Sequence, residues 1–329
     1  MPNQDVLLVT YPNREGDVPV WDHPLLRGYR KVPKDHYYPY TSLAQVLSIY
    51  KRQYFTEEDL VLLKVLGDCI CANEDQIRRL FTAKTEMSRS EVSKRLDQFR
   101  KFALVERWSC RIEREANQRK PPAPFSLGVA GFILMRHLYG DQFFKNPDNW
   151  QGIMEVQRYV AMNEVRTRLV ESGNIRDWKW NVLLGGNPRN DKPFGVAKME
   201  TPKGYVNILF ERAQQSQNFV GFLRKKLDNW RRVNEVFGKL PLSEFDEHTS
   251  MVVISVSTKT VAEYLHEQLL LDQYKDFQVM LCIDEYFDEG FERAFFVANG
   301  PELKRVQLSF VAPTLNLEEQ EIAAGVAHE

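Results

Sequence analysis

Basic and hydroxyl side chains concentrate between Lys84 and Lys120, and their types suit contacts with a polyanion. This segment holds 11 Lys and Arg against 6 Asp and Glu, whereas the whole chain of 329 residues has a formal net charge of −1. Lys and Arg donate hydrogen bonds to phosphates and to guanine O6 and N7, and Ser can contact several bases or a phosphate. A local positive patch in a nearly neutral chain is the electrostatic signature expected of a duplex-binding element.

The first half of this segment predicts a helix that begins after Ser88. Ser88 and Glu91 have the Ser-x-x-Glu spacing of a capping box. Val92, Leu96 and Phe99 then recur at helical spacing, which assigns them to the buried face. The opposite face carries the candidate DNA-contacting residues of the helix, which are Arg89, Ser90, Ser93, Lys94 and Asp97.

The second half of the segment predicts a basic hairpin. Residues 104–108 alternate as a strand does, residues 111–120 are polar and basic, and Phe125–Leu127 follows three prolines as the returning strand. We expect this hairpin to contact phosphates or the minor groove. Its candidate contact residues are Arg107, Arg111, Arg114, Arg119 and Lys120.

Two further helix starts precede the Ser88 helix. Thr56 is followed by three acidic residues, and Asn73 by two, which is the pattern of a capping residue with acids in the first turn. A helix at 129–138 follows the hairpin. This order is that of a winged helix-turn-helix, whose third helix enters the major groove. We therefore expect residues 51–140 to be a winged helix-turn-helix DNA-binding domain, after an N-terminal extension over 1–50.

Downstream, helices and strands follow the order αβββαβαβ with a last strand after it, which predicts a mixed sheet flanked by helices. The predicted helices are 155–172, 217–237 and 260–271, and the predicted strands are 178–184, 194–199, 205–211, 251–256, 278–283 and 295–297. We place this α/β domain at 150–312, after a turn-rich linker over 140–150. The acidic tail over 313–329 is expected to be disordered. The fold class is thus a mixture of α+β and α/β.

The order of a winged helix, the segment Phe-Ser-Leu-Gly-Val-Ala-Gly at 125–131 and an α/β domain resembles the bacterial replication-relaxation family. The resemblance covers roughly residues 56–285. It implies a protein of a plasmid or another mobile element, whose α/β domain is related to PD-(D/E)xK nucleases. Those nucleases hold Mg²⁺ with acids on two neighbouring strands and place a lysine nearby.

The acids that such a nuclease needs are largely missing from this sequence. Phe194 and Leu209 stand where the family pattern places acids, so Glu211 alone remains, with Lys225 or Lys226 as its candidate partner. A single carboxylate supplies too few ligands to hold Mg²⁺ at a phosphodiester. We therefore expect a nuclease-like domain that is inactive, with no catalytic residue, metal or cofactor. An acidic stretch at 284–289 is expected to be an exposed loop.

Together these observations predict a non-enzymatic, sequence-specific double-stranded DNA-binding protein. The resemblance implies a role in control of transcription, replication or transfer on a plasmid, phage or integrative element. A homodimer and a protein partner on the α/β domain are further expectations. Two alternatives stay open: a metal-dependent nuclease of the PD-(D/E)xK type, and a scaffold that uses the winged helix for protein contacts. The basic residues of helix 217–237 suit either a second nucleic-acid surface or a solvated face.

Composition and the N-terminal sequence bear on the cellular compartment of the protein. No apolar run approaches the roughly 18 residues that a membrane-spanning helix needs. The first residues lack the basic start and apolar core of a signal peptide. The four cysteines lack the spacing of a metal site, so we expect buried, reduced thiols. We therefore expect a cytoplasmic protein with no membrane contact.

Overall fold

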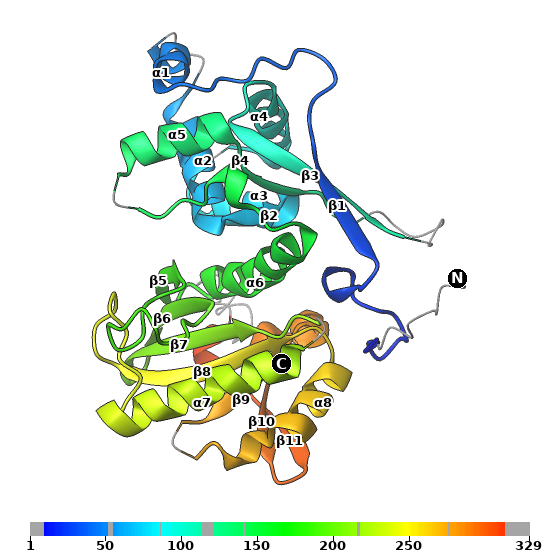
Figure 1. The fold of residues 1–329 in the computed structure, drawn as a ribbon, viewed down its shortest axis with the longest axis vertical. Coiled ribbons are helices and arrows are strands. Elements are labelled where there is room, and N and C mark those ends of the chain that lie inside the picture. The colour runs from blue at the N-terminus through cyan, green and yellow to red at the C-terminus, as the bar shows by residue number, and fades with distance from the viewer. Residues whose placement is uncertain are drawn as a thin grey trace, which may run out of the picture. The chain divides into compact units, whose positions relative to one another are not determined.

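The computed structural model describes residues 10–51, 55–85, 87–113, 121–140, 142–215, 218–275 and 277–312. The chain divides into two compact units, with residues 20–167 in the first and the segments on either side of them in the second. Each unit has its own sheet, so the expected mixture of helices and strands is confirmed (Figure 1). The expected wing residues Arg114, Arg119 and Lys120, and the tail over 313–329, lie outside the described residues.

The first unit combines helices with a small antiparallel sheet. Its strands have the order β1-β3-β4-β2. The helix α6 begins in this unit, and the boundary between the units falls within it. The helices are α1 (Leu43–Lys51), α2 (Glu57–Cys69), α3 (Glu74–Thr82), α4 (Arg89–Lys101), α5 (Val129–Leu138) and α6 (Ile153–Glu171), and the strands are β1 (Leu26–Lys31), β2 (Cys71–Asn73), β3 (Val105–Ile112) and β4 (Pro124–Leu127).

The three predicted helix starts of the first unit are confirmed. Thr56, Asn73 and Ser88 cap α2, α3 and α4. In each capping box the cap side chain accepts a hydrogen bond from the backbone N–H of the third helical residue, whose side chain accepts one from the backbone N–H of the cap. These exchanges satisfy N–H groups that a helix end leaves without partners. The positions of these three helix starts are therefore local properties of the sequence.

The strand β1 differs from the sequence-based expectation, which assigned residues 1–50 to an N-terminal extension and predicted no strand there. It pairs antiparallel with β3, from Leu26 opposite Ile112 to Lys31 opposite Arg107. Its sequence, Leu-Arg-Gly-Tyr-Arg-Lys, lacks the apolar alternation by which strands are recognised. The partner strand β3, which is distant in sequence, supplies the hydrogen bonds that make this segment a strand.

Two glycines explain why α5 packs so closely on the end of α4. A Cβ atom at Gly128 would lie 2.2 Å from the carbonyl oxygen of Ala103, and one at Gly131 would lie 2.1 Å from that of Leu104. The backbone N–H of Ala130 donates to the Ala103 oxygen at 3.0 Å. These glycines belong to the segment 125–131 that carries the family resemblance. We infer that packing requires glycine at both positions.

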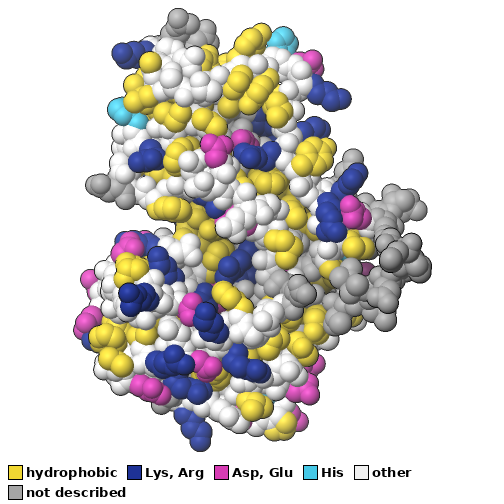
Figure 2. All heavy atoms as spheres, viewed as in Figure 1, with side chains coloured by type: hydrophobic (Ala, Val, Ile, Leu, Met, Phe, Trp, Pro, Cys, Tyr) yellow, Lys and Arg dark blue, Asp and Glu magenta, His cyan; other side chains and the backbone are white. Residues whose placement is uncertain are grey.

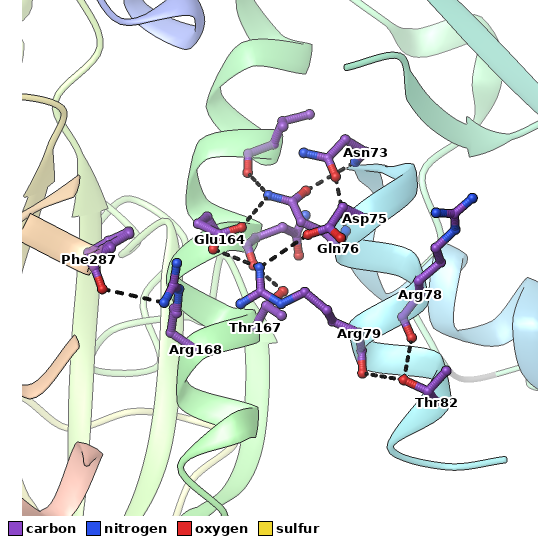
Figure 3. A network of polar contacts seen from close by, with 12 residues as sticks. Asn73, Asp75, Gln76, Arg78, Arg79, Thr82, Glu164, Thr167, Arg168 and Phe287 are labelled. Atoms are coloured by element: carbon purple, nitrogen blue, oxygen red, sulfur yellow. Dashed lines mark hydrogen bonds and ion pairs between the residues drawn. The ribbon is translucent and has the colours of Figure 1, made fainter. Parts of the chain in front are cut away.

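The helix α6 is fixed to α3 by a polar network (Figure 3). Gln76 Nε2 donates to the Val160 oxygen at 2.9 Å and to Glu164 Oε2 at 3.2 Å. Arg79 Nη1 lies 2.8 Å from Glu164 Oε1, so this carboxylate receives hydrogen bonds from both α3 residues. Because Gln76 is buried and Arg79 mostly so, these contacts hold α3 and α6 in one register.

Asn163 on α6 holds the turn between α2 and β2. Its Nδ2 group donates to the carbonyl oxygens of Cys69 and Cys71, both at 2.8 Å. Ile70 lies between these cysteines and adopts a φ of 63°, which a β-branched residue rarely tolerates. We infer that the buried Asn163 amide stabilises a strained backbone conformation.

Replacing Asn163 with leucine is expected to lower the free energy of unfolding by about 1–3 kcal/mol for each buried carbonyl left without a donor. Equilibrium urea unfolding followed by circular dichroism measures the change. Asn149, which is exposed, provides the control, since Asn149→Leu should change the free energy of unfolding by no more than about 0.5 kcal/mol. Equal effects of the two substitutions would contradict the role of Asn163.

The second unit is built on a seven-stranded mixed sheet with the order β11-β10-β9-β8-β7-β6-β5. The pairs β7–β8 and β8–β9 are parallel, and the other neighbours are antiparallel. The helices α7 and α8 connect the parallel strands and lie side by side in front of the sheet (Figure 1). The elements are β5 (Ile175–Trp180), β6 (Gly195–Thr201), β7 (Gly204–Arg212), α7 (Phe219–Phe237), β8 (Thr249–Val256), α8 (Lys259–Leu269), β9 (Val279–Ile283), β10 (Phe295–Asn299) and β11 (Glu302–Val306).

Three details of the second unit differ from the predictions. The strand expected at 178–184 is β5 at Ile175–Trp180, and β11 was not predicted. Asp284–Glu289, expected to be an exposed acidic loop, is a short 3-10 helix that buries Tyr286 and Phe287. The aromatic residues between the acids anchor this segment. Among the described residues, no helix combines the length and apolar character needed to cross a membrane.

Candidate nucleic-acid interface

The helix α4 buries one face and exposes the other, as the sequence predicts. Val92, Leu96 and Phe99 are buried in the core of the first unit. The expected contact residues Arg89, Ser90, Lys94 and Asp97 are exposed.

Ser93 differs from the other predicted contact residues of α4. It is half-buried, and its hydroxyl donates a hydrogen bond to the Glu74 carboxylate on α3. Arg78, also on α3, donates to both of these groups. We infer that the Ser93 hydroxyl links α4 to α3, whereas Arg89, Ser90, Lys94 and Asp97 lie on the exposed face of α4.

The acidic residues of α4 are engaged by neighbouring groups. Ser88 donates hydrogen bonds to the Glu91 carboxylate from its hydroxyl, at 2.6 Å, and from its backbone N–H, at 2.9 Å, and these bonds lower the pKa of Glu91. Asp97 Oδ1 lies 3.0 Å from Arg100 Nη1. By contrast, Arg89 and Lys94 form no ion pair with any described residue. Positive charge on the exposed face of α4 is therefore less diluted than the sequence count suggests.

The hairpin places two of its predicted contact residues in the described part of the structure. Arg111 is exposed near the end of β3, and Arg107 is half-buried with its guanidinium 5.9 Å from the centre of the Phe125 ring. Beside them on β1 lie Arg27 and Lys31, which the sequence did not identify as candidates. Their basic character could have identified them as candidates. Because no strand was predicted for this segment, however, nothing in the sequence placed them near the hairpin.

In the second unit, two of the three candidate residues of a nuclease site lie together and the third lies apart. Glu211 is 1% exposed and forms an ion pair with Lys226, whose ammonium lies 5.2 Å from the Phe222 ring centre and 5.6 Å from that of Trp230. Lys225 is exposed on the other side of α7. Lys226, and not Lys225, is thus the partner of Glu211.

The positions expected to carry acids hold buried apolar side chains. Leu209 is fully buried in β7. Phe194, which donates its backbone N–H to the Phe210 oxygen at 2.9 Å, precedes β6 on the strand that pairs with β7. Within the described residues, no group of three or more His, Cys, Asp or Glu is arranged to hold a metal ion.

A second charged cluster lies at the ends of the parallel strands. Arg212 is almost fully buried, and its Nη1 donates to Asp284 Oδ2 at 2.6 Å and to Ser255 Oγ at 2.8 Å. A guanidinium suits this role because it offers several donors in fixed directions. The cluster ties β7, β8 and the residue after β9 together.

The basic residues of α7 have different surroundings. Lys226 is buried, Arg231 covers the Tyr274 ring at 4.3 Å, and Arg224 donates to the Gln268 oxygen at 2.7 Å. A surface hollow of about 350 Å³ is lined by Arg224, Lys225 and Arg232, but also by Asp191 and Asp228. On the face seen in Figure 2, basic and acidic side chains alternate along α7. The surface of the helix therefore carries charges of both signs.

All four cysteines are free and buried, as predicted. Burial raises the pKa of the Cys69 and Cys110 thiols to about 11, and it raises the pKa of Cys71 and Cys282 well above the usual value.

At pH 8 the native protein is therefore expected to leave all four thiols unreacted toward an aromatic disulfide reagent. With a pKa of about 11, on the order of 0.1% of a thiol is in the reactive thiolate form at this pH. The denatured protein serves as the control and should react at four thiols. Rapid release of one equivalent from the native protein would contradict this expectation.

No protein-family model matches the chain, and no curated protein or solved structure matches it.

Proposed function

We propose that the first unit contains a winged helix-turn-helix that binds double-stranded DNA sequence-specifically, with α4 in the major groove. The chain order α2-β2-α3-α4-β3-β4 supports this proposal, because a winged helix has three helices followed by a hairpin. The strand order β2-β4-β3 supports it as well, since the returning strand of the hairpin pairs with the short strand between the first two helices.

The observation that carries the proposal is the exposed face of α4. Arg89 and Lys94 are exposed without an ion-pair partner among the described residues, on a helix whose opposite face is buried. Such side chains can donate to guanine O6 and N7 in the major groove. Ser90 can contact a base or a phosphate, and Asp97 can accept a hydrogen bond from cytosine N4. Arg107 and Arg111 would bind phosphates beside the helix.

The proposal is tested by selecting duplexes from a random pool with the purified protein and then titrating the selected duplex at several salt concentrations. Enrichment of one sequence, with an affinity that falls as salt rises, is the expected result. Equal affinity for selected and random duplexes would overturn sequence-specific binding. Absence of binding to any duplex would favour the alternative in which the first unit is a protein-interaction scaffold.

We also propose that the second unit is a nuclease-like domain without cleavage activity, consistent with a relative of the replication-relaxation family. The order β5-β6-β7-α7-β8 after the C-terminal end of α6, with β7 parallel to β8, supports the nuclease-like comparison. The engagement of Glu211 with Lys226 supports inactivity. Incubation with plasmid DNA and Mg²⁺ or Mn²⁺ tests this proposal. Cleavage that Glu211→Ala abolishes would establish the metal-dependent nuclease instead.

The remaining parts of the proposal concern the oligomeric state of the protein and the process that it controls. A homodimer would bring two copies of α4 to paired half-sites about one helical turn of DNA apart. The α/β unit is then the proposed surface for self-association or for another protein partner. Control of transcription, replication or transfer on a mobile element is the proposed process. Sedimentation with and without the selected duplex measures the stoichiometry, and one protomer per full site would contradict the dimer.

A further inference from the structure

Two pairs of like charges face each other across the β1–β3 strand pair. Arg27 lies opposite Arg111, and Lys31 lies opposite Arg107. Directly opposed residues of an antiparallel pair have their side chains on the same face of the sheet. Like charges in this position destabilise a sheet, so their presence in two rows on one face requires an explanation other than stability.

This face holds more positive charge than its surroundings neutralise. Arg27 Nε lies 3.4 Å from Glu113 Oε2, but Lys31, Arg107 and Arg111 form no ion pair with a described residue. The opposite face of β1 differs. There Arg30 lies 3.2 Å from Glu106 Oε2 and donates to a backbone oxygen at 3.1 Å. An acidic side chain thus pairs with the basic residue on one face of β1. On the other face, three of the four basic residues have no such partner among the described residues.

The basic face is on the side of the sheet where the helix α2 packs. Val105 shares a face with Arg107 by strand alternation and is paired with Leu127. Leu127 extends toward α2, because a Cβ atom at Gly67 would lie 3.1 Å from its methyl group. At the outer end, Arg100 of α4 donates to the Lys31 oxygen at 3.3 Å. The C-terminal end of α4 therefore contacts the end of β1 that carries Lys31.

We propose that Arg27, Lys31, Arg107 and Arg111 form a phosphate-binding ladder for the duplex DNA that flanks the bases read by α4. This inference rests on the proposed function and assigns β1, a strand outside the winged helix, to the interface. Arg27 and Lys31 are four residues apart, which is about 13 Å along a strand. This separation is close to the roughly 12 Å width of the major groove, so the two rows can reach phosphates on both of its edges.

Tyr29 lies between the two basic rows and is 60% exposed. Its partner across the strands is Ser109, so this middle row of the basic face also offers hydrogen-bond donors. Figure 2 shows Lys and Arg side chains over the position of β1. These contacts would raise affinity for any duplex without discriminating between sequences, because phosphates carry no base information.

The double variant Arg27→Gln/Lys31→Gln tests the ladder in the full-length protein. Each phosphate contact contributes about −0.9 to the slope of log affinity against log salt concentration, so the slope should become shallower by roughly 2. Affinity should fall by the same factor for selected and random duplexes. Arg30→Gln, on the same strand but the opposite face, is the matched control and should leave the slope unchanged. Thermal unfolding checks that each variant is folded.

The possible outcomes separate this inference from the proposed function. A shallower slope in the double variant alone supports the ladder. An unchanged slope in a folded double variant, when substitution of Arg89 and Lys94 still removes specific binding, overturns the ladder and leaves the proposed function standing. If the wild-type protein binds no duplex, both fail. Equal effects of Arg30→Gln and the double variant would also overturn the ladder, since they indicate a general effect of charge.

Discussion

Replacing Lys226 with methionine is expected to lower the free energy of unfolding by about 3–5 kcal/mol. Lys226 and Glu211 form an ion pair in which the side chains are 7% and 1% exposed. Removing the ammonium would leave the Glu211 carboxylate buried without its cationic partner. The loss of that partner costs far more than the loss of an ion pair on the surface, because water cannot replace it.

Equilibrium urea unfolding measures the effect, and Lys225→Met provides the matched control. Lys225 is the next residue on α7, carries the same charge and is exposed, so its replacement should change the free energy of unfolding by about 0.5 kcal/mol or less. The double variant Glu211→Leu/Lys226→Met completes a double-mutant cycle. Its cost should be smaller than the sum of the single costs by at least about 1 kcal/mol, because the two side chains interact directly.

The Lys226 variant also separates the two readings of the second unit. If Lys226 and Glu211 serve mainly to stabilise the fold, their loss lowers the free energy of unfolding, and neither the wild-type protein nor the variant cleaves DNA. If they are catalytic, their loss abolishes metal-dependent cleavage while stability changes little. A Lys226→Met protein as stable as the Lys225→Met protein would therefore contradict the structural role of this pair.

Replacing Arg89 and Lys94 together with alanine is expected to weaken binding to the selected duplex by at least about 30-fold. Both side chains are exposed on α4 and form no ion pair with a described residue. Each good side-chain contact with a base contributes about 1–3 kcal/mol of discrimination, so two contacts together contribute at least about 2 kcal/mol. Because the lost contacts are with bases, binding to random duplexes should weaken much less.

A titration at fixed salt concentration measures both affinities. The control Lys203→Ala/Lys304→Ala removes the same charge from exposed positions of the second unit and should leave both affinities nearly unchanged. If the α4 variant and this control behave alike, α4 is not the reading helix. A third variant, Ser93→Ala, should lower the free energy of unfolding, since the Ser93 hydroxyl contacts α3. It should leave the ratio of affinities for selected and random duplexes nearly unchanged.

The amino-acid sequence by itself determined the features that arise from neighbouring residues. The capping boxes at Thr56, Asn73 and Ser88 lie within four residues, so their helix starts were predicted correctly. The buried face of α4 follows from helical spacing in the same way. The mixture of helices and strands also follows from local patterns, because apolar periodicity is largely a local property.

Tertiary structure alone decided the features that depend on distant partners. The strand β1 forms because β3, about 80 residues away, offers it hydrogen bonds, and this pairing places Arg27 and Lys31 beside Arg107 and Arg111. The role of Ser93 depends on Glu74 in another helix. Lys226 and Lys225 have the same side chain, and only the packing of α7 on the sheet buries one of them against Glu211. A sequence pattern assigns a residue to a face of its own element, but the partner across that face is chosen by the packing of the chain.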